Sequence, residues 1–336
     1  MENKIMIRVA IVGTGGMGTV HYHNYEHIDD AEVVAVVDVS EKSQETADRW
    51  NLPLYEDIDQ CAQSEVVDVF DICTPTFLHK HLVMQALNNN KHAITEKPIA
   101  LTRNDAEEMY ALAKEKGKLL FVGQVLQFTK EIEVLRGLVQ SEEYGKPLDA
   151  HFERLSARPR WVQDSWLFDK DKSGLLPFDL HIHDLDVIVS LFGRPENFNF
   201  TSCKGRDKSY EEHFRFLYDF DDLHVCAEAA WFNADIPFTA RWRMYFENAV
   251  VINDGTSLTA YQFDKAPRVF DTEENLKIPT GINLPPTGMF HKELSHFMKC
   301  IKQGIPSDKV TKEQVLTVVE LLEEITDSVY GKENIF

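Results

Sequence analysis

The stretch IRVAIVGTGGMG, residues 7–18, decides the fold of the first third of this chain. Residues 7–12 form an apolar run rich in β-branched side chains, which is typical of a buried strand. The glycines that follow have the spacing G-x-G-x-x-G, and a helical pattern continues to about His27. A second strand is expected at residues 33–38, where it ends on Asp38. Strand, glycine turn, helix and a strand ending on an acid together predict a dinucleotide-binding unit.

Each glycine of this turn has a physical reason to be there. Gly13 permits the tight turn, Gly15 lets the backbone approach a pyrophosphate, and Gly18 lets helix and strand pack closely. The start of the helix supplies N–H donors and a positive dipole end. The expected contacts with the cofactor are Gly13, Thr14, Gly15, Gly16, Met17, Gly18 and Asp38. The alternative is a glycine-rich turn without a ligand.

Asp38 also bears on which dinucleotide is bound. Its carboxylate can accept hydrogen bonds from both ribose hydroxyls of NAD and would repel the 2′-phosphate of NADP. We therefore expect NAD in preference to NADP, although Lys42 is close in sequence and weakens this preference.

The pattern predicts two domains. Strands expected at 66–73, 92–97 and 118–123 alternate with helices at 77–90 and 104–117. This alternation predicts an N-terminal Rossmann domain, a doubly wound parallel α/β sheet, over residues 1–123.

From 124 onward we expect a helix, a strand near 148–156, a helix from Pro177 to Gly193, a run of strands to about 263, and helices near 289–303 and 311–329. The strands alternate with period two, for example Phe238, Ala240, Trp242, Met244 and Phe246 against Thr239, Arg241, Arg243 and Tyr245. Residues 124–336 are thus predicted to be an α+β substrate-binding and oligomerisation domain with a large, mostly antiparallel sheet.

Composition limits the function classes. The chain has 336 residues and a formal net charge of −20, which argues against non-specific binding to nucleic acid. Its five cysteines contain no C-x-x-C pair, so a reduced, cytoplasmic setting is expected. No apolar run approaches the roughly 20 residues of a membrane span, and the N-terminus does not read as a signal peptide.

Lys97 is the first candidate for chemistry. The segment TEKP, residues 95–98, follows a predicted parallel strand, and ligands bind outside the carboxyl ends of such strands. Lys97 would then face the cofactor and stabilise charge on a substrate oxygen. The alternative is a solvated loop lysine.

The segment FDLHIHDLD, residues 178–186, is the second candidate. On a helix, Asp179 and His183 are one turn apart on one face, whereas His181 is turned away by about 200°. This spacing opposes a compact metal site, so no metal is predicted. A carboxylate one turn from an imidazole suits proton transfer. A capped helix start with a core histidine is the alternative.

The chain resembles the glucose–fructose oxidoreductase / inositol dehydrogenase (Gfo/Idh/MocA) family over essentially its whole length. The resemblance rests on GTGGMG, Asp38, CTPTFLH (73–79), EKP, VGQVLQF (122–128), YGKP (144–147), LSARPRW (155–161) and the D-x-x-x-H pair, in that order. It implies hydride transfer between a nicotinamide cofactor and a secondary hydroxyl or keto group of a sugar, cyclitol or related polyol. It also implies Lys97, Asp179 and His183 as the catalytic set, a cis bond between Lys97 and Pro98, and a homodimer or homotetramer formed through the C-terminal sheet.

Further site residues are expected around the cofactor and the substrate. Additional cofactor contacts are expected at Thr74, Pro75, His79, Glu96, Lys97 and Gln124. Substrate contacts are expected at Arg158, Trp161 and Trp166, since indoles can cover a sugar face, and loop packing is the alternative for these three. The chain departs from many relatives at Gln127, Leu175, Pro177 and His181, which puts the identity of the substrate in doubt. Two other functions stay open: a catalytically silent protein that senses dinucleotide or sugar, and a metal-dependent hydrolase suggested only by the HIHD run.

Overall fold

The chain forms two compact units. The computed structural model describes residues 6–160, 166–282 and 284–331. Unit 1 comprises Met1–Phe128 and Glu274–Val319, and unit 2 comprises Thr129–Glu273 and Glu320–Phe336. Residues 274–319 thus pack with the N-terminal region, whereas the sequence suggested one break at 123/124. A functional boundary at that position stays a prediction.

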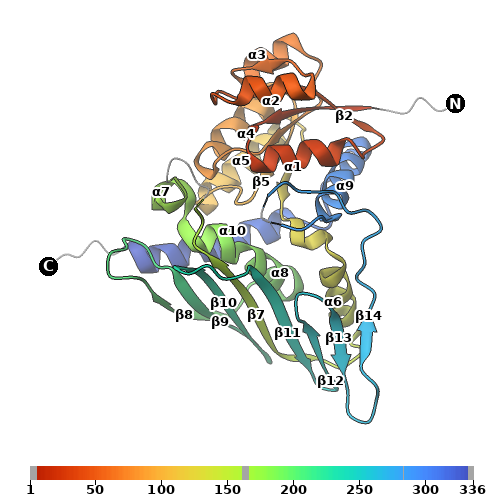
Figure 1. Cartoon of the computed structure of the whole chain (residues 1–336), viewed down its shortest axis with the longest axis vertical. Coiled ribbons are helices and arrows are strands. Elements are labelled where there is room, and N and C mark those ends of the chain that lie inside the picture. Colours follow the sequence, from red (N-terminus) through yellow and green to blue (C-terminus); the bar gives the residue numbers. More distant parts are fainter. Residues whose placement is uncertain (1–5, 161–165, 283, 332–336) are drawn as a thin grey trace. The chain divides into compact units, whose positions relative to one another are not determined.

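Unit 1 is built on a six-stranded parallel sheet in the order β3-β2-β1-β4-β5-β6 (Figure 1). Its strands are β1 (Ile7–Val12), β2 (Ala31–Val37), β3 (Leu54–Tyr55), β4 (Val69–Ile72), β5 (His92–Glu96) and β6 (Leu120–Gly123). Its helices are α1 (Gly16–Tyr25), α2 (Ser43–Trp50), α3 (Ile58–Ser64), η1 (Thr76–Leu78), α4 (His79–Asn88), α5 (Arg103–Glu115), η2 (Val125–Phe128), α9 (Met289–Gln303) and the start of α10 (Lys312–Tyr330). The predicted doubly wound fold is confirmed.

Helix α9 explains why residues far apart in sequence share unit 1. Its Phe297 stacks on Phe121 of β6 at 4.8 Å between ring centroids. The same ring meets Phe128 edge-on at 5.8 Å. All three side chains are buried, so α9 completes the core of this unit.

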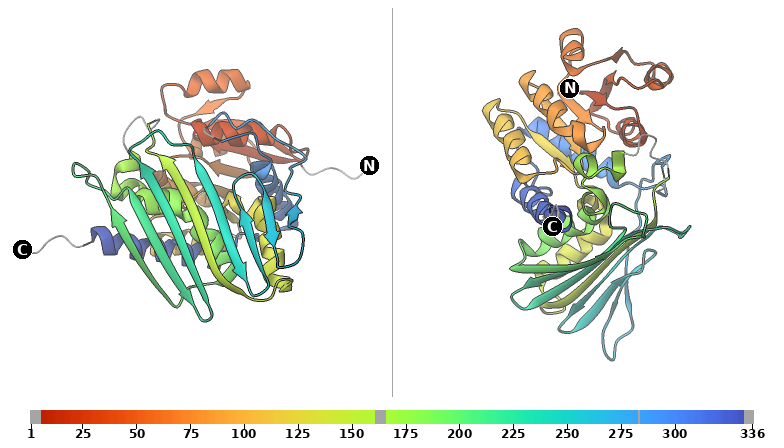
Figure 2. Two further views of the ribbon diagram at one scale, coloured as in Figure 1. Left: turned by 60° about the horizontal axis from the view of Figure 1, so that its bottom comes forward. Right: turned by 90° about the vertical axis from the view of Figure 1, so that its left-hand side faces the viewer.

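Unit 2 is built on an eight-stranded sheet in the order β14-β13-β12-β11-β7-β10-β9-β8 (Figures 1 and 2). Its strands are β7 (Pro147–Ala157), β8 (Asn197–Cys203), β9 (His213–Phe220), β10 (Leu223–Phe232), β11 (Thr239–Phe246), β12 (Ala249–Asn253), β13 (Leu258–Tyr261) and β14 (Arg268–Phe270). The helical segments are α6 (Lys130–Ser141), η3 (Trp166–Phe168), α7 (Lys170–Ser173), η4 (Pro177–His181), α8 (Ile182–Phe192) and the end of α10. All strand pairs are antiparallel except β7 with β10, which confirms the mostly antiparallel sheet.

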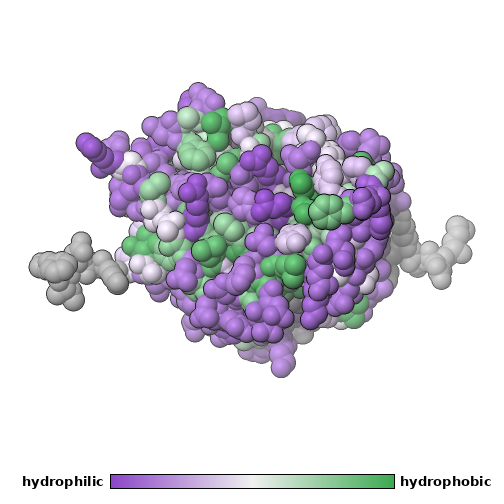
Figure 3. Space-filling view, turned by 90° about the horizontal axis from the view of Figure 1, so that it is seen from below, coloured by the Kyte–Doolittle hydropathy of each residue, from purple (hydrophilic) through white to green (hydrophobic). Residues whose placement is uncertain are grey.

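The two faces of this sheet differ. Helices α6 and α8 lie on one face, and the strands of the other face are uncovered in the left view of Figure 2. On β11, Trp242 and Met244 are buried, whereas Arg243 and Tyr245 are exposed, as the alternation predicted. Phe238 departs from the expectation: it precedes β11 and is 40% exposed. Figure 3 views the molecule from below, where hydrophobic groups lie in separate patches among hydrophilic ones.

None of the helices in the described part of the chain has the length and apolar character needed to cross a membrane.

Candidate active site

The turn between β1 and α1 is tight where it meets protein and open where a ligand would lie. Gly13 has φ +94°, and a Cβ there would lie 2.9 Å from the carbonyl oxygen of Cys73. A Cβ on Gly18 would clash with the carbonyl oxygen of Gly13. Among the described residues, nothing lies within 4 Å of the Cβ position of Gly15. This combination lets the backbone at Gly15 approach a phosphate closely.

The start of α1 suits an anion. Gly15 is its N-cap and makes no side-chain cap, and the first turn contains no acidic residue. Its free backbone N–H groups and the helix dipole therefore favour a pyrophosphate. Met17 is partly buried and packs its side chain on a cluster of Val20, Val125 and Phe290.

Asp38 follows β2 and is fixed against the glycine turn. Its Oδ2 accepts hydrogen bonds from the backbone N–H of Thr14 at 2.6 Å and from the Thr14 hydroxyl at 2.5 Å. Its Oδ1 accepts one from the N–H of Ser40 at 2.7 Å. Partial burial acts to raise the pKa of Asp38, but the bonds from Thr14 and Ser40 outweigh it and hold the pKa below its usual value. A fixed, ionised carboxylate at this position fits the ribose of NAD.

The end of β4 offers a further polar atom. Thr74 Oγ1 is buried and has no hydrogen-bond partner among the described residues. The His79 ring is 1% exposed; its Nε2 lies 2.8 Å from the Thr74 carbonyl oxygen and its Nδ1 lies 2.7 Å from that of Pro98. Burial lowers the pKa of His79, although both carbonyls favour the cation. The ring ties two turns together, and its contact with a cofactor stays a prediction.

Lys97 follows β5 at the same edge of the sheet. It is half-buried, and its bond to Pro98 is cis, as the resemblance implied. Its backbone N–H donates to Oε2 of Glu96 at 3.1 Å. Gly123 leaves room for this carboxylate, because a Cβ there would lie 3.1 Å from Oε1 of Glu96. Gln124, the next residue, is 2% exposed. Since β1, β4, β5 and β6 are consecutive in the sheet, the glycine turn, Thr74 and Lys97 share one edge.

A buried polar network, not predicted from the sequence, joins α1, β4 and β5. His21 Nδ1 lies 2.8 Å from Oδ2 of Asp71 and 3.3 Å from Sγ of Cys73. Its Nε2 lies 3.2 Å from Oε1 of Glu96, an ion-pair distance without the angle of a hydrogen bond. Tyr25 donates to Oδ2 of Asp71 at 2.9 Å. These partners are at least 46 residues from His21 and Tyr25 in sequence, so no local pattern could have revealed them.

The protonation of this network follows from its charges. Burial acts to lower the pKa of His21, but Asp71 and Cys73 outweigh it and raise the pKa well above 6.5. Burial raises the pKa of Cys73 to about 12, so it remains a thiol. His21, Asp71 and Cys73 are near enough to hold a metal ion. However, tetrahedral zinc ligands lie about 3.3 Å or more apart, and the 2.8 Å between His21 and Asp71 is a hydrogen-bond distance.

Asp179 and His183 lie in unit 2, where a π-helical turn runs into α8. The N–H of Ile182 donates to the carbonyl of Pro177, so this turn is wider than the α-helical turn assumed from the sequence. Both Asp179 and His183 are half-buried. Lys97 belongs to unit 1, so the convergence of these three residues stays a prediction.

His181 contacts the sheet. Its ring is fully buried, stacks on Phe216 at 3.9 Å between centroids, and has Nε2 2.8 Å from the hydroxyl of Tyr218. Burial, with a smaller effect of the Arg154 charge, lowers the pKa of His181 to about 3. His181 is therefore a neutral core histidine.

A buried ion pair fixes α8 on the sheet. Arg154 of β7 donates to both carboxylate oxygens of Asp184, at 3.1 Å from Nε and 2.7 Å from Nη2. Both side chains are less than a tenth exposed. The sequence did not predict this pair, because the two charges belong to elements 30 residues apart.

The predicted substrate contacts have differing surroundings. The guanidinium of Arg158 lies 4.4 Å from the ring centroid of Phe168, and its backbone N–H donates to Phe232 at 2.8 Å. Trp166 is half-buried at the start of η3. Trp161 lies outside the described residues. Their contact with a substrate stays a prediction.

The positions that depart from relatives are mostly buried. Gln127 is fully buried, and Pro177 and His181 are buried on the π-helical turn. Leu175 is 2% exposed and has φ +61°, a left-handed conformation that glycine adopts more readily.

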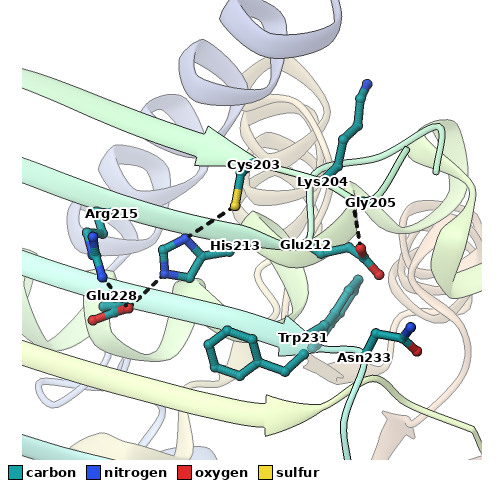
Figure 4. Close-up of a pocket in the computed structure, with 10 residues that line it drawn as sticks. Cys203, Lys204, Gly205, Glu212, His213, Arg215, Glu228, Trp231 and Asn233 are labelled. Atoms are coloured by element: carbon teal, nitrogen blue, oxygen red, sulfur yellow. Dashed lines mark hydrogen bonds and ion pairs between the residues drawn. The ribbon is translucent and has the colours of Figure 1, made fainter. Parts of the chain in front are cut away.

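A pocket of about 480 Å³ in unit 2 is lined by none of the residues predicted from the sequence, although its Phe232 accepts the backbone N–H of Arg158 at 2.8 Å (Figure 4). Two acids, Glu212 and Glu228, line the pocket, and Glu228 pairs with His213 at 2.7 Å and with Arg215 at 3.3 Å. Partial burial acts to raise the pKa of Glu228, but these partners hold it below the usual value. The carboxylate is already neutralised and is poorly suited to take a proton.

Two family models match the chain. Residues 7–124 match the model described as "Oxidoreductase family, NAD-binding Rossmann fold", and residues 132–252 match the Gfo/Idh/MocA C-terminal domain. The chain belongs to the Gfo/Idh/MocA family. The resemblance stated from the motifs is thereby confirmed.

Several Gfo/Idh/MocA relatives are similar to the chain. A 2,7-anhydro-N-acetylneuraminate hydratase of Mediterraneibacter gnavus is 32% identical over 57% of this chain and 51% of its own. The myo-inositol 2-dehydrogenase of Thermotoga maritima is 29% identical over 56% of this chain and 55% of its own. The chain thus spans about half the length of these relatives.

A levoglucosan dehydrogenase solved with NADH and levoglucosan has a TM-score of 0.83, at 18% identity and 98% coverage of both chains. At this identity, the likeness shows a shared fold.

Proposed function

We propose that the protein is an NAD-dependent dehydrogenase or reductase that acts on a secondary hydroxyl or keto group of a sugar, cyclitol or related polyol. The observation that carries the proposal is the shared sheet edge of unit 1, where Lys97 follows β5 and the glycine turn follows β1. Named activities of family relatives support it, including a myo-inositol 2-dehydrogenase and a levoglucosan dehydrogenase.

In this proposal the residues of the chain bind and orient the cofactor and the substrate, and they transfer one proton. NAD, when bound, supplies the acceptor for the hydride that leaves the carbinol carbon. Lys97 hydrogen-bonds the substrate oxygen and stabilises its developing charge. His183 takes the proton of the hydroxyl, and Asp179 stabilises the imidazolium. The carbon thus loses a hydride and the oxygen a proton, which leaves a ketone; reduction follows the reverse path.

The cofactor set in this proposal combines the glycine turn with the neighbouring strand ends. The N–H groups of Gly15, Gly16 and Met17 hold the pyrophosphate, and Asp38 holds the ribose. The remaining contacts are Gly13, Thr14, Gly18, Thr74, Pro75, His79, Glu96, Lys97 and Gln124. Arg158, Trp161 and Trp166 contact the substrate.

Binding and turnover together test this function. Calorimetry with NAD(H) and NADP(H) should show tighter binding of NAD(H), and a panel of polyols and sugars should include one that changes the absorbance of reduced nicotinamide. Substrate consumption must be followed as well, because a hydratase such as the M. gnavus relative need not change that absorbance. Binding without any turnover would favour the sensor, and no dinucleotide binding would contradict the proposal.

The assembly and setting belong to the same proposal. The uncovered face of the unit 2 sheet carries exposed Leu217, Tyr245 and Tyr261, which supports a homodimer or homotetramer formed through this face. All five cysteines are free thiols, which supports a cytoplasmic location. A net charge of −20 supports the absence of a nucleic-acid partner.

A further inference from the structure

The network around His21 places one imidazole between two carboxylates of neighbouring strands. Asp71 belongs to β4, and Glu96 is the last residue of β5. His21 and Asp71 are fully buried, and Glu96 is 8% exposed. Two ionised carboxylates in so little water would repel each other strongly unless a positive charge lay between them. His21 can supply that charge, because each ring nitrogen of an imidazolium carries a proton.

The carboxylate of Glu96 connects His21 to Lys97. Oε1 of Glu96 faces His21 Nε2 at 3.2 Å, and Oε2 accepts the backbone N–H of Lys97 at 3.1 Å. The space for this carboxylate exists because residue 123 on the adjacent strand is glycine. His21 lies on α1, less than one turn beyond Gly18 of the glycine motif. A chain of contacts therefore runs from the dinucleotide-binding helix to the backbone of Lys97.

We propose that His21 is a positioning residue for the reaction, which as an imidazolium fixes the Glu96 carboxylate and through it the backbone of Lys97. The inference rests on the catalytic role of Lys97 under the proposed function. Under this inference α1 has two roles, because the helix that binds the cofactor also sets the position of the catalytic lysine.

The groups that face His21 support the charged form. These are Asp71 of β4, Cys73 just after β4, and Glu96 of β5. Tyr25, on α1 itself, donates to Asp71, and Glu293 of α9 lies close enough to act on the Tyr25 hydroxyl electrostatically. Phe290 of α9 closes the remaining side, at 6.1 Å between ring centroids. The thiol and phenol stay neutral because burial raises both pKa values, so two carboxylates, those of Asp71 and Glu96, face one cationic ring.

The charge of His21 can be read without any activity. Nitrogen-15 NMR of the unmodified protein, with the His21 signal assigned by its loss in His21→Gln, should show both ring nitrogens protonated at pH 7.5. The exposed His23, which is two residues away and pairs with Glu26, is the internal reference. A neutral His21 ring at this pH would overturn the proposal, and the protonation state itself is read in the unmodified protein.

Kinetics then test the link to Lys97. His21→Gln should lower kcat about 10- to 100-fold, since a small misplacement of a catalytic group has effects of this size, and should leave the Kd for NAD within about threefold. His23→Gln is the matched control and should leave both unchanged. Because His21 acts through Lys97, His21→Gln with Lys97→Ala should be no slower than Lys97→Ala alone, within about twofold.

The remaining outcomes separate this inference from the proposed function. Full activity of His21→Gln would overturn the positioning role of His21. So would a double variant whose loss in kcat equals the product of the two single losses. In both cases the catalytic role of Lys97 would stand. Full activity of Lys97→Ala would instead refute the catalytic role on which the inference rests. Should His21→Gln not fold, Glu96→Gln serves in its place, since it keeps an acceptor for the Lys97 N–H and removes only the charge. Glu96→Gln should lower kcat about tenfold, and it should cause no further loss in kcat when it is combined with Lys97→Ala.

Discussion

At the scale of single residues, Asp38 shows how a local hydrogen-bond pattern sets cofactor preference. Its carboxylate is held by Thr14 and Ser40 and stays ionised. A fixed negative charge at the ribose favours two hydroxyls and disfavours a phosphate.

Replacing Asp38 should therefore change the choice of dinucleotide. Asp38→Ser should weaken NAD binding about tenfold, because hydrogen bonds to a charged group are worth about 1.5–3 kcal/mol. NADP binding should strengthen, because the repulsion is removed. Calorimetry measures both, with exposed Glu41→Gln as control. An unchanged ratio of the two affinities would show that Asp38 does not contact the ribose.

His181 makes stability depend on pH. Its pKa is about 3 in the folded protein, because burial disfavours the cation, against about 6.5 unfolded. The unfolded chain thus binds more protons between these values, so the contribution of the neutral ring is complete above pH 6.5 and is lost as pH falls. The loss should be about 1.4 kcal/mol per pH unit. Urea unfolding at pH 7.5, 5.5 and 4.5 should show this extra slope in the natural chain relative to His181→Gln; equal slopes would contradict it.

Residue chemistry was predictable where it depends on neighbours in sequence. The glycine turn, Asp38 and the strand end before Lys97 could all be placed from local patterns. The His21 network and the pair of Arg154 with Asp184 could not, because each joins groups that only strand pairing or helix packing brings together. Strand-end position and helical spacing pointed to Lys97, Asp179 and His183 as candidates, the family resemblance implied them as the catalytic set, and their convergence stays a prediction.

At the scale of elements, one ion pair anchors α8, the helix that carries His183. Arg154 and Asp184 are both buried, so removing one partner leaves an uncompensated charge. Arg154→Met should lower the free energy of unfolding by about 3–5 kcal/mol, whereas Arg154→Met with Asp184→Leu should recover most of it. Urea unfolding measures both. A double variant as unstable as the single one would show that the pair contributes more than charge compensation.

The types of the helices and strands could be predicted from hydrophobic periodicity, but the pairing of the strands could not. Alternating patterns predicted a run of strands to about 263, where β9 to β13 lie, and the helices expected near 289–303 and 311–329 are close to the observed α9 and α10. The parallel pairing of β7 with β10 joins strands separated by several other elements, which no local pattern specifies. The π-helical turn at Pro177 also escaped prediction, since its apolar spacing reads equally well as an α-helix.

At the scale of the whole molecule, the uncovered sheet face should determine assembly. Tyr245 is 44% exposed there and pairs across strands with Asp149 and Val250. Light scattering should give the mass of a dimer or tetramer, and Tyr245→Lys should shift it toward monomer, because burying an unpaired charge is costly. Phe263→Lys, at a 98% exposed aromatic outside the sheet, is the control and should change nothing. A monomeric natural chain would contradict this assembly.

The central claim is that Lys97 carries the chemistry of an NAD-dependent dehydrogenase, and the turnover number of Lys97→Ala tests it most directly. With a substrate from the polyol and sugar panel, kcat should fall by about 10²–10⁴-fold. The Kd for NAD should rise far less than kcat falls, because Lys97 is only one of many cofactor contacts, and exposed Lys114→Ala should behave like the natural chain. A Lys97→Ala variant that turns over at the natural rate would contradict the account.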